Sequence, residues 1–245
     1  MTDGAIVVGA SAGIGEALVR TLAADGYEVG LASRRVDRLK AIGAEVPTKA
    51  YVARMDLAEP EAAREAFVDL AEAMRSVDLV VISSGVGHSN RDLEWEPERE
   101  TIDVNVRGFV AVATAALEQF EANRDAGRKK DGHLVGLSSV AAVFGNGAAP
   151  AYNASKAFVS TYLEGLRYRQ AGREADVSIT TVEPGFVDTE LAMGEFWMCS
   201  PETAARQILW AVDRDRRRVY VTRRWRLVVW LLAALPERVL ERLFT

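Results

Sequence analysis

The sequence predicts an α/β fold with a doubly wound parallel sheet of about seven strands and helices on both faces. Short apolar, β-branched runs alternate with longer segments of helical period, which is the pattern of repeated β-α-β units. The run Leu79–Ile82 is apolar at every position, as expected of a strand that helices cover on both faces. With 245 residues, 49% of them hydrophobic, the chain can build one large core. We therefore expect a single domain over residues 1–245.

The expected elements follow this alternation in order. The first strand leads directly into a helix that begins near Ile14, and a later helix runs from Ala151 to about Arg169. The polar stretch Glu121–Gly132 is interpreted as a solvated loop or a frayed helix end, and helices fill most of the remaining gaps. The expected strands are Ala5–Gly9, Tyr27–Ser33, Ala50–Met55, Leu79–Ser83, Leu134–Ser138, Val177–Val182 and Val219–Thr222.

Composition narrows the class of partner. The formal net charge is −5 and basic residues are scattered except near the C-terminus, so we expect a small-molecule partner, no nucleic acid and no metal. Cys199 is the only cysteine, which excludes an intrachain disulfide and gives little support for a catalytic nucleophile. The N-terminus lacks the pattern of a signal peptide, and no apolar segment reaches the ~18 to 20 residues of a spanning helix. We expect a cytoplasmic protein.

The first strand runs into the turn Gly9-Ala10-Ser11-Ala12-Gly13-Ile14-Gly15. Glycines at a strand-to-helix junction let the backbone approach a pyrophosphate, and the helix N-terminus offers free N–H groups with partial positive charge. Ser11 can add a hydroxyl donor. The alternative is a glycine-rich turn without a ligand, but the position after the first strand favours dinucleotide binding.

Tyr152 and Lys156 lie four residues apart, so on a helix the phenol and the ammonium share one face. A nearby positive charge stabilises a phenolate and lowers the pKa of tyrosine, which makes the pair a candidate general acid/base. Alone the pattern is weak, because a tyrosine that packs its ring and a lysine that faces water are common on helices. The glycine turn and Ser139, thirteen residues before Tyr152, are the context that favours the chemical interpretation.

With these motifs in this order, nearly the whole chain resembles the short-chain dehydrogenase/reductase family. The resemblance implies a single-domain Rossmann fold and an assembly of two or four identical subunits. It implies that Ser139 orients the substrate, that Tyr152 is the acid/base, and that Lys156 binds the cofactor and lowers the pKa of Tyr152. Asn105 matches the asparagine of the family's proton relay. Ser138 is the rival of Ser139, and the spacing of thirteen residues to the tyrosine favours Ser139.

The end of the second strand bears on the choice of cofactor. An acidic side chain there accepts from the ribose 2′-hydroxyl of NAD, whereas arginine meets the 2′-phosphate of NADP. The chain has Ser33-Arg34-Arg35, so we expect NADP (NADPH), with Arg34 as the first choice for the phosphate. The alternative is that both arginines belong to a solvated helix start, and Arg35 fits that interpretation.

Further positions follow from the resemblance. Asp56 and Leu57 match a pair that contacts adenine, although Asp56 is equally interpreted as a helix cap. Two departures are Ile82-Ser83-Ser84-Gly85 in place of the usual Asn-Asn-Ala-Gly and Val8 in place of threonine, from which we expect altered hydrogen bonding around the ends of the central strands. The implied cofactor-binding residues are Gly9, Ser11, Gly13, Ile14, Gly15, Ser33, Arg34, Asp56, Leu57, Ser84, Gly85, Asn105, Tyr152, Lys156, Pro184, Gly185, Val187 and Thr189.

Two apolar segments follow these motifs. The family has a mobile loop over the substrate where this chain has Glu190–Ser200, and Met193, Phe196, Trp197 and Met198 in it suggest either a hydrophobic substrate or core and subunit contacts. The amphipathic tail, residues 224–245, combines arginines with leucine and tryptophan. It is interpreted either as a helix at a membrane surface or as one packed on a subunit or the sheet edge.

These observations lead to one expected function. The chain is expected to be an oxidoreductase that moves a hydride between NADP(H) and a carbonyl or secondary alcohol, on a hydrophobic substrate, by a Ser-Tyr-Lys mechanism. The alternatives are a non-catalytic NADP(H)-sensing protein and a membrane-associated reductase of lipid-like substrates.

Overall fold

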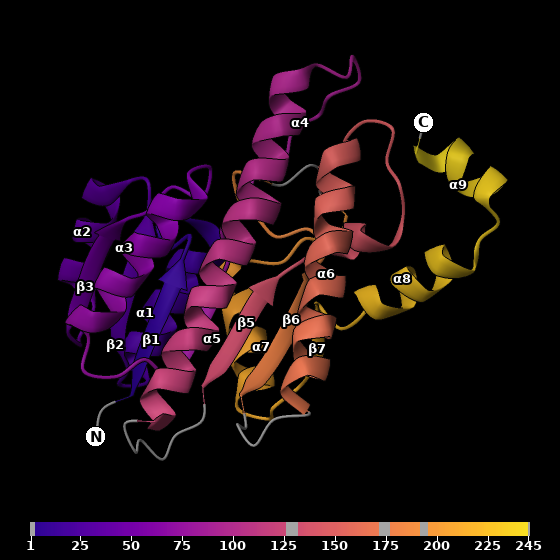
Figure 1. The fold of residues 1–245 in the computed structure, drawn as a ribbon. Helices are drawn as coiled ribbons and strands as arrows, with labels where there is room; N and C mark the ends of the chain where they lie inside the picture. Colours follow the sequence, from indigo (N-terminus) through magenta and orange to yellow (C-terminus); the bar gives the residue numbers. More distant parts are fainter. Residues whose placement is uncertain (1–2, 126–131, 172–176, 192–195, 245) are drawn as a thin grey trace.

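The computed structural model describes residues 3–125, 132–171, 177–191 and 196–244. In these residues the chain forms one seven-stranded sheet in the order β3-β2-β1-β4-β5-β6-β7, and every neighbouring pair of strands is parallel. Helices flank the sheet on both sides, so the predicted α/β doubly wound Rossmann fold is confirmed (Figure 1). The strand order reverses between β1 and β4, where folds of this type bind their ligands.

The seven predicted strands are present, and no strand end differs from the prediction by more than two residues. Gly9 was expected to end the first strand, but its φ of 92° turns the chain out of β1 toward the first helix. His133 and Pro184 extend their strands beyond the predicted ends. The strands are β1 (Gly4–Val8), β2 (Glu28–Ser33), β3 (Ala50–Arg54), β4 (Leu79–Ile82), β5 (His133–Leu137), β6 (Ser178–Pro184) and β7 (Arg218–Val221).

Two apolar cores hold the three layers together. On one face, the core is closed by α1 (Gly13–Ala24), α2 (Val36–Glu45) and α7 (Pro201–Val212). On the other face, it is closed by α3 (Pro60–Ala73), α5 (Phe109–Asp125) and α6 (Pro150–Ala171). The strands carry apolar side chains toward both layers, which explains why their sequences are apolar at successive positions. The sheet edge that carries the strand carboxyl ends is therefore held rigidly from both sides.

Local signals set several helix starts. Pro201 lies in the first turn of α7, and the side chain of Ser200 accepts a hydrogen bond from the backbone N–H of Thr203. Pro60 likewise lies in the first turn of α3. Between α4 (Trp95–Ile102) and α5, the chain forms a π-helical segment, η1 (Asp103–Gly108), which the sequence analysis did not predict. This segment contains Asn105, the residue that the sequence matches to the asparagine of a proton relay.

The C-terminal tail forms two short helices, α8 (Trp225–Ala234) and α9 (Glu237–Phe244), which lie outside the sheet layers at the right of Figure 1. Leu235 and Pro236 separate them. Trp225 and Val229 are buried, so α8 is attached to the body by one face. No helix in the described part of the chain combines the length and apolar character needed to cross a membrane. Of the polar stretch Glu121–Gly132, residues 126–131 lie outside the described residues.

Candidate active site

A cleft opens where β1 and β4 end side by side. Its backbone is close-packed: a Cβ on Gly9 would lie 2.6 Å from the amide nitrogen of Ser84 and 2.9 Å from the Ser83 hydroxyl. Gly15 packs so tightly on the carbonyl of Gly9 that a Cβ would overlap it. The glycines therefore bring the strand-to-helix turn onto the end of β4, and they leave open the space in front of the N-terminus of α1, where Gly13 has a φ of 55°.

The departure at Ser83 leaves the central strands tied together. The hydroxyl of Ser83 donates to the carbonyl of Val8 at 2.9 Å, and the amides of Ser83 and Ser84 donate to the same carbonyl at 2.9 and 3.1 Å. A serine thus supplies a side-chain link between β1 and β4 where the sequence analysis expected altered hydrogen bonding. Gly85 follows, and a Cβ there would lie 3.1 Å from Nζ of Lys156.

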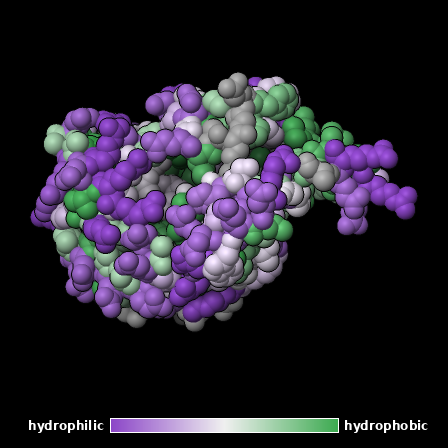
Figure 2. Space-filling model, turned by 90° about the horizontal axis from the view of Figure 1, so that it is seen from above, coloured by the Kyte–Doolittle hydropathy of each residue, from purple (hydrophilic) through white to green (hydrophobic). Residues whose placement is uncertain are grey.

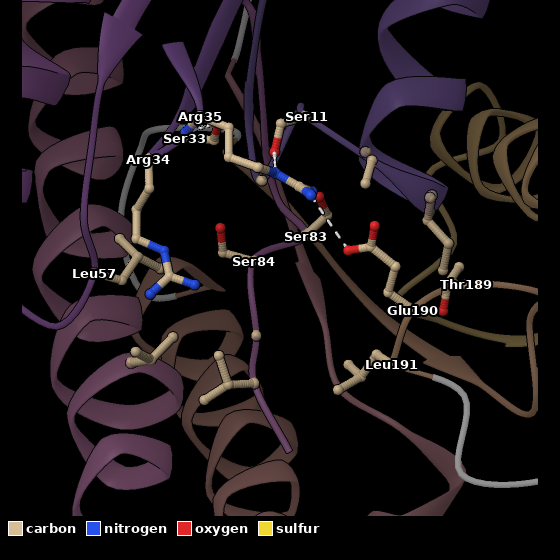
Figure 3. A pocket seen from close by; sticks show the side chains of 18 of the residues that line it. Ser11, Ser33, Arg34, Arg35, Leu57, Ser83, Ser84, Thr189, Glu190 and Leu191 are labelled. Atoms are coloured by element: carbon tan, nitrogen blue, oxygen red, sulfur yellow. Dashed lines mark hydrogen bonds and ion pairs between the residues drawn. The ribbon is translucent and has the colours of Figure 1, made fainter. Parts of the chain in front are cut away.

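Two arginines from the start of α2 face this cleft in different ways (Figure 3). Arg34 points inward beside Leu57 and Ser84, and its Nη1 lies 3.9 Å from Oε1 of Glu100. Arg35 reaches across the mouth of the cleft: its Nε donates to Oγ of Ser11 at 3.1 Å and its Nη1 lies 3.3 Å from Oε2 of Glu190. Arg35 therefore belongs to the cleft, although the sequence analysis assigned it more readily to a solvated helix start.

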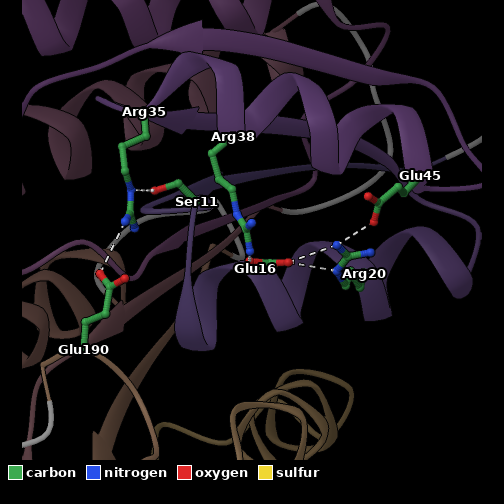
Figure 4. A network of polar contacts seen from close by, with 7 residues as sticks. All are labelled: Ser11, Glu16, Arg20, Arg35, Arg38, Glu45 and Glu190. Carbon is green, nitrogen blue, oxygen red and sulfur yellow. Dashed lines mark hydrogen bonds and ion pairs between the residues drawn. The ribbon is translucent and has the colours of Figure 1, made fainter.

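Arg35 and Arg38 differ in the elements from which their ion-pair partners come (Figure 4). Arg38 Nη2 lies 3.0 Å from Glu16, which also pairs with Arg20, so α2 is tied to α1. Arg38 thus has a carboxylate partner on the adjacent helix. Arg35 instead takes its partner from the distant segment after β6, across the cleft. Its positive charge is presented to the cavity between them.

The cleft holds a cavity of about 430 Å³. Asp56 accepts a hydrogen bond from the amide of Ala58 at 3.1 Å and does not cap α3, so the helix-cap interpretation of Asp56 is wrong. The backbone amide of Arg35 donates to the hydroxyl of Ser33 at 3.2 Å. The predicted residues that line this cavity are Gly9, Ser11, Gly13, Ile14, Gly15, Ser33, Arg34, Asp56, Leu57, Ser84, Gly85 and Thr189.

A second, largely apolar cavity of about 530 Å³ adjoins the first, and it contains Ser139, Tyr152 and Lys156. Ile14, Ser83, Gly85, Thr189 and Leu191 line both cavities, so the two meet at the strand ends. Pro184, Gly185 and Val187 line the second cavity rather than the first. A dinucleotide laid along the first cavity would thus present its far end to the second.

The hydroxyl of Tyr152 is hydrogen-bonded to Ser139, which lowers the pKa of the phenol, but burial has the larger effect and raises that pKa above its usual value. Burial lowers the pKa of Lys156 from 10.5 to about 8. The Nζ of Lys156 lies 5.8 Å from the centroid of the Tyr152 ring. We expected Lys156 to lower the pKa of Tyr152, but Ser139 makes that contribution, and the phenol stays protonated at neutral pH.

Lys156 is held at the floor of the pocket, where its Nζ donates to the carbonyl of Leu137 at 3.1 Å. Asn105 lies on the other side of Gly85 and uses its whole amide: Oδ1 accepts from the Val86 N–H at 2.9 Å, and Nδ2 donates to the Val86 carbonyl at 2.8 Å and to the Ser155 hydroxyl at 3.0 Å. Asn105 thus joins the π-helical segment, the loop after β4 and helix α6, and it fixes the backbone on which Lys156 is carried.

The two adjacent serines at the end of β5 differ in their partners. Ser138 donates to the carbonyl of Lys156 at 2.7 Å and accepts from Ser160 at 2.8 Å, so its hydroxyl is used inside the protein. The Oγ of Ser139 accepts from the amide of Ala141 at 3.1 Å, and its hydroxyl is directed into the pocket, toward the hydroxyl of Tyr152. The geometry therefore favours Ser139 over Ser138 as the group that meets a substrate.

The C-terminal tail supplies the far wall of the second cavity, which the sequence analysis did not predict. Trp225 packs directly on Gly185, where a Cβ would overlap its indole ring. Phe244 stacks on Phe144 with ring centroids 4.1 Å apart. No sequence pattern predicts these contacts, because they join segments that are far apart in the chain. The residues of the tail that line the cavity are Trp225, Val228, Val229, Leu232, Leu243 and Phe244.

In the segment expected to cover the substrate, Leu191 lines both cavities, whereas Phe196 and Trp197 lie outside them. Phe196 and Trp197 stack on each other at 4.6 Å and meet the edge of Trp225 at 6.0 and 6.2 Å, outside the cavity lining. Met193 lies outside the described residues. Cys199 is half-buried, and burial raises the pKa of its thiol, which is the opposite of an activated nucleophile.

Comparison with known proteins agrees with this geometry. The family model of the short chain dehydrogenases matches residues 3–198. An uncharacterized oxidoreductase of Myxococcus xanthus is 38% identical over 192 residues, covering 76% of this chain and 73% of its own. One from Mycobacterium tuberculosis is 30% identical over 250 aligned residues, covering 97% of this chain and 95% of its own.

Among solved structures, an alcohol dehydrogenase from the archaeon Thermococcus sibiricus, complexed with 5-hydroxy-NADP, is similar to this chain. It superposes with a TM-score of 0.76 at 26% sequence identity, over 87% of this chain and 91% of its own. The glycine turn, the order of the strands and the match over residues 3–198 all agree, so the resemblance seen in the sequence is confirmed. The chain belongs to the short-chain dehydrogenase family of oxidoreductases.

Proposed function

We propose that the protein is an NADP(H)-dependent oxidoreductase that interconverts an apolar carbonyl compound and its secondary alcohol. The observation that carries this proposal is that the cavity containing Ser139 and Tyr152 opens, at the strand ends, into another cavity of different lining. One is lined by glycines and arginines and the other is largely apolar. A polar nucleotide and an apolar substrate would thus approach the same proton donor from opposite sides.

The first cavity fits a dinucleotide phosphate. Its glycines keep Cβ atoms out of the space in front of the α1 N-terminus, where free N–H groups and the helix dipole favour an anion. Arg34 and Arg35 offer guanidinium groups to a 2′-phosphate. The similar alcohol dehydrogenase from Thermococcus sibiricus was solved with 5-hydroxy-NADP, which supports the same class of cofactor here. Lys156 would hold the ribose end, near Gly85, while Asn105 would fix the loop that follows Gly85.

The chemistry follows from the protonation of the site. Bound NADPH supplies the hydride that reduces the carbonyl carbon. The hydroxyl of Ser139 donates to the carbonyl oxygen and orients it, and Tyr152, kept protonated by burial, gives that oxygen its proton. The phenolate that remains regains a proton through Lys156, whose pKa of about 8 lets it exchange protons near neutral pH. The apolar second cavity excludes water from this transfer.

The apolar cavity also supports the choice of substrate class. At about 530 Å³ it lies within the usual ~300 to 1,000 Å³ of ligand pockets. Its wall of valine, leucine and phenylalanine side chains from α8 and α9 offers a substrate no charged group. A cytoplasmic location, expected from the sequence, and an assembly of two or four subunits, implied by the resemblance, stay predictions.

The test is NADPH oxidation by the purified protein against a panel of ketones, aldehydes, quinones and steroids. Tyr152→Phe is expected to lower the rate at least about 100-fold with every active substrate, while binding of NADPH is retained. Tyr162→Phe is the matched control, because Tyr162 lies on the same helix with its ring stacked on Phe158 and away from the cavities. An unchanged rate in Tyr152→Phe would favour the alternative of a non-catalytic NADP(H)-sensing protein.

A further inference from the structure

Helices α8 and α9 carry apolar side chains on two faces, and only one of these faces lines the second cavity. The inner face contributes Val228, Val229 and Leu232 to the cavity wall. The amide of Gly147 donates to the carbonyl of Phe244 at 3.0 Å, so the end of α9 is hydrogen-bonded to the body of the protein. The inner contacts fix the orientation of both helices and thereby determine which side chains face outward.

The outer face of α8 presents Leu227, Trp230 and Leu231, which are 69%, 58% and 63% exposed. Their spacing of three and four residues places them on one side of the helix. Leu243 of α9 is also exposed. In Figure 2 hydrophobic side chains gather on the right, where these helices lie, and hydrophilic side chains project beyond them. A clustered patch of this kind on an otherwise polar surface marks a contact site.

The surroundings of this patch are basic. Residues 223–242, which comprise most of α8 and α9 and the turn before them, contain five arginines and two acidic residues, whereas the whole chain has a net charge of −5. The guanidinium of Arg226 lies 4.5 Å from the centroid of the Trp230 ring, within the patch itself. Arg223 and Arg224 lie at the start of α8, and Arg238 and Arg242 are exposed on α9. The patch is therefore apolar at its centre and positively charged around it.

The charge decides between the two occupants that an apolar patch usually has. A second copy of this chain would pair the patch with itself about a two-fold axis, which brings one arginine-rich surface against another. An anionic lipid surface instead offers headgroups of opposite charge to the arginines and an acyl region to the leucines. Tryptophan beside arginine is also the combination favoured at the membrane interface. Neither helix is long enough to span a bilayer.

We propose that the outer face of α8 and α9, centred on Leu227, Trp230 and Leu231, docks on the surface of an anionic lipid bilayer. In that position the helices lie in the interface plane, between the lipid and the apolar cavity that their inner face lines. Docking does not depend on the oxidoreductase reaction, so it can be tested separately from it.

The experiment is flotation of the full-length protein with vesicles of phosphatidylcholine alone or mixed with phosphatidylglycerol. The protein is expected to float with the phosphatidylglycerol vesicles. High salt, which screens the charges of the arginines, should weaken this binding. Trp230→Ser/Leu231→Gln should lower the bound fraction at least about tenfold. Tyr168→Ser, which removes an aromatic side chain 68% exposed on α6, is the matched control and should float like the wild type.

Two further variants make the result decisive. Tyr152→Phe should float like the wild type, so a failure of the proposed chemistry does not affect this test. Arg226→Gln/Arg238→Gln, which alters exposed side chains only, should lose the preference for phosphatidylglycerol even if the Trp230→Ser/Leu231→Gln variant folds poorly. Wild-type protein that does not float with phosphatidylglycerol vesicles overturns the proposal. A Trp230→Ser/Leu231→Gln variant that splits an oligomer in sedimentation velocity also overturns it, since the patch would then bind a second copy.

Discussion

The guanidinium of Arg35 lies 3.3 Å from the carboxylate of Glu190, and this ion pair joins the end of β2 to the segment after β6 across the mouth of the nucleotide cleft. Both side chains are exposed, so the pair contributes little to stability. The position of the ion pair at the cleft matters more than its contribution to stability. The carboxylate occupies the partner position that a phosphate would take on Arg35, and the two anions therefore compete for one guanidinium.

Glu190→Gln is expected to lower the KM for NADPH by about three- to tenfold, because it removes the negative charge that competes with the 2′-phosphate. The KM for NADH, which has no phosphate at that position, should change by less than about twofold. Steady-state kinetics with both cofactors checks this. Equal effects on the two cofactors would mean that Glu190 acts on the shared part of the nucleotide.

Arg34→Ala and Arg35→Ala are each expected to raise the KM for NADPH about tenfold, since each removes a charge-assisted hydrogen bond to phosphate. The double variant should lose most of the preference for NADPH over NADH. Arg38→Ala is the control, because Arg38 is already paired with Glu16 at 3.0 Å and does not line the cleft. If Arg38→Ala has the same effect as Arg35→Ala, the general positive potential rather than a specific contact selects the cofactor.

Ser139→Ala is expected to lower kcat about 100-fold with little loss of stability, because it removes a donor to the substrate oxygen. Ser138→Ala should behave in the opposite way: it breaks the bond to the Lys156 carbonyl and costs about 1–3 kcal/mol of unfolding free energy, with a smaller loss of kcat. Urea unfolding and kinetics on the same preparations separate the two effects. A larger kcat loss in Ser138→Ala would reverse the assignment of the two serines.

Gly13→Ala is expected to raise the KM for both cofactors and to destabilise the fold by about 1–2 kcal/mol, since φ is 55° and the new Cβ would lie 2.8 Å from Cγ2 of Thr189. Adding Thr189→Ser removes that methyl group and should restore part of the stability. Gly26→Ala is the control, because φ there is 93° and no atom lies within 4 Å. It should cost stability without affecting either KM, as thermal unfolding and kinetics would show.

Lys156→Met is expected to be inactive but more stable than the wild type at neutral pH. Depression of the lysine pKa from 10.5 to about 8 corresponds to about 3 kcal/mol spent on burying the charge. That cost is fully present below pH 8, where the folded protein carries the ammonium. It disappears as the pH rises from about 8 to 10.5, because over this range the unfolded chain binds more protons than the folded one.

The advantage of Lys156→Met should therefore shrink between about pH 7 and about pH 10, and urea unfolding at both values measures it. Lys40→Met is the control, since Lys40 is exposed on α2 and its replacement should have the same small effect at both pH values. A constant difference between Lys156→Met and the wild type would contradict a lysine that is charged at pH 7 and buried.

The sequence predicted the parts of the molecule whose signals are local. The apolar runs of the strands, the glycine turn after β1 and the spacing of Tyr152 and Lys156 depend only on neighbouring residues, and the fold agrees with them. Arg35 could not be placed in the same way, because its partner Glu190 is 155 residues away. The π-helical segment at Asn105 was missed for a related reason, since it is held by Val86 and Ser155 from other elements.

The C-terminal tail follows residue 198, where the match to the family model ends, and it contacts the body of the protein where Trp225 packs on Gly185. Ser139, Tyr152 and Lys156 all lie before that boundary, and much of the apolar wall of the second cavity lies after it. The chain is thus modular along its sequence: changes in a short terminal segment can reshape the apolar wall without replacing any residue of the Ser139, Tyr152 and Lys156 cluster or of the glycine turn.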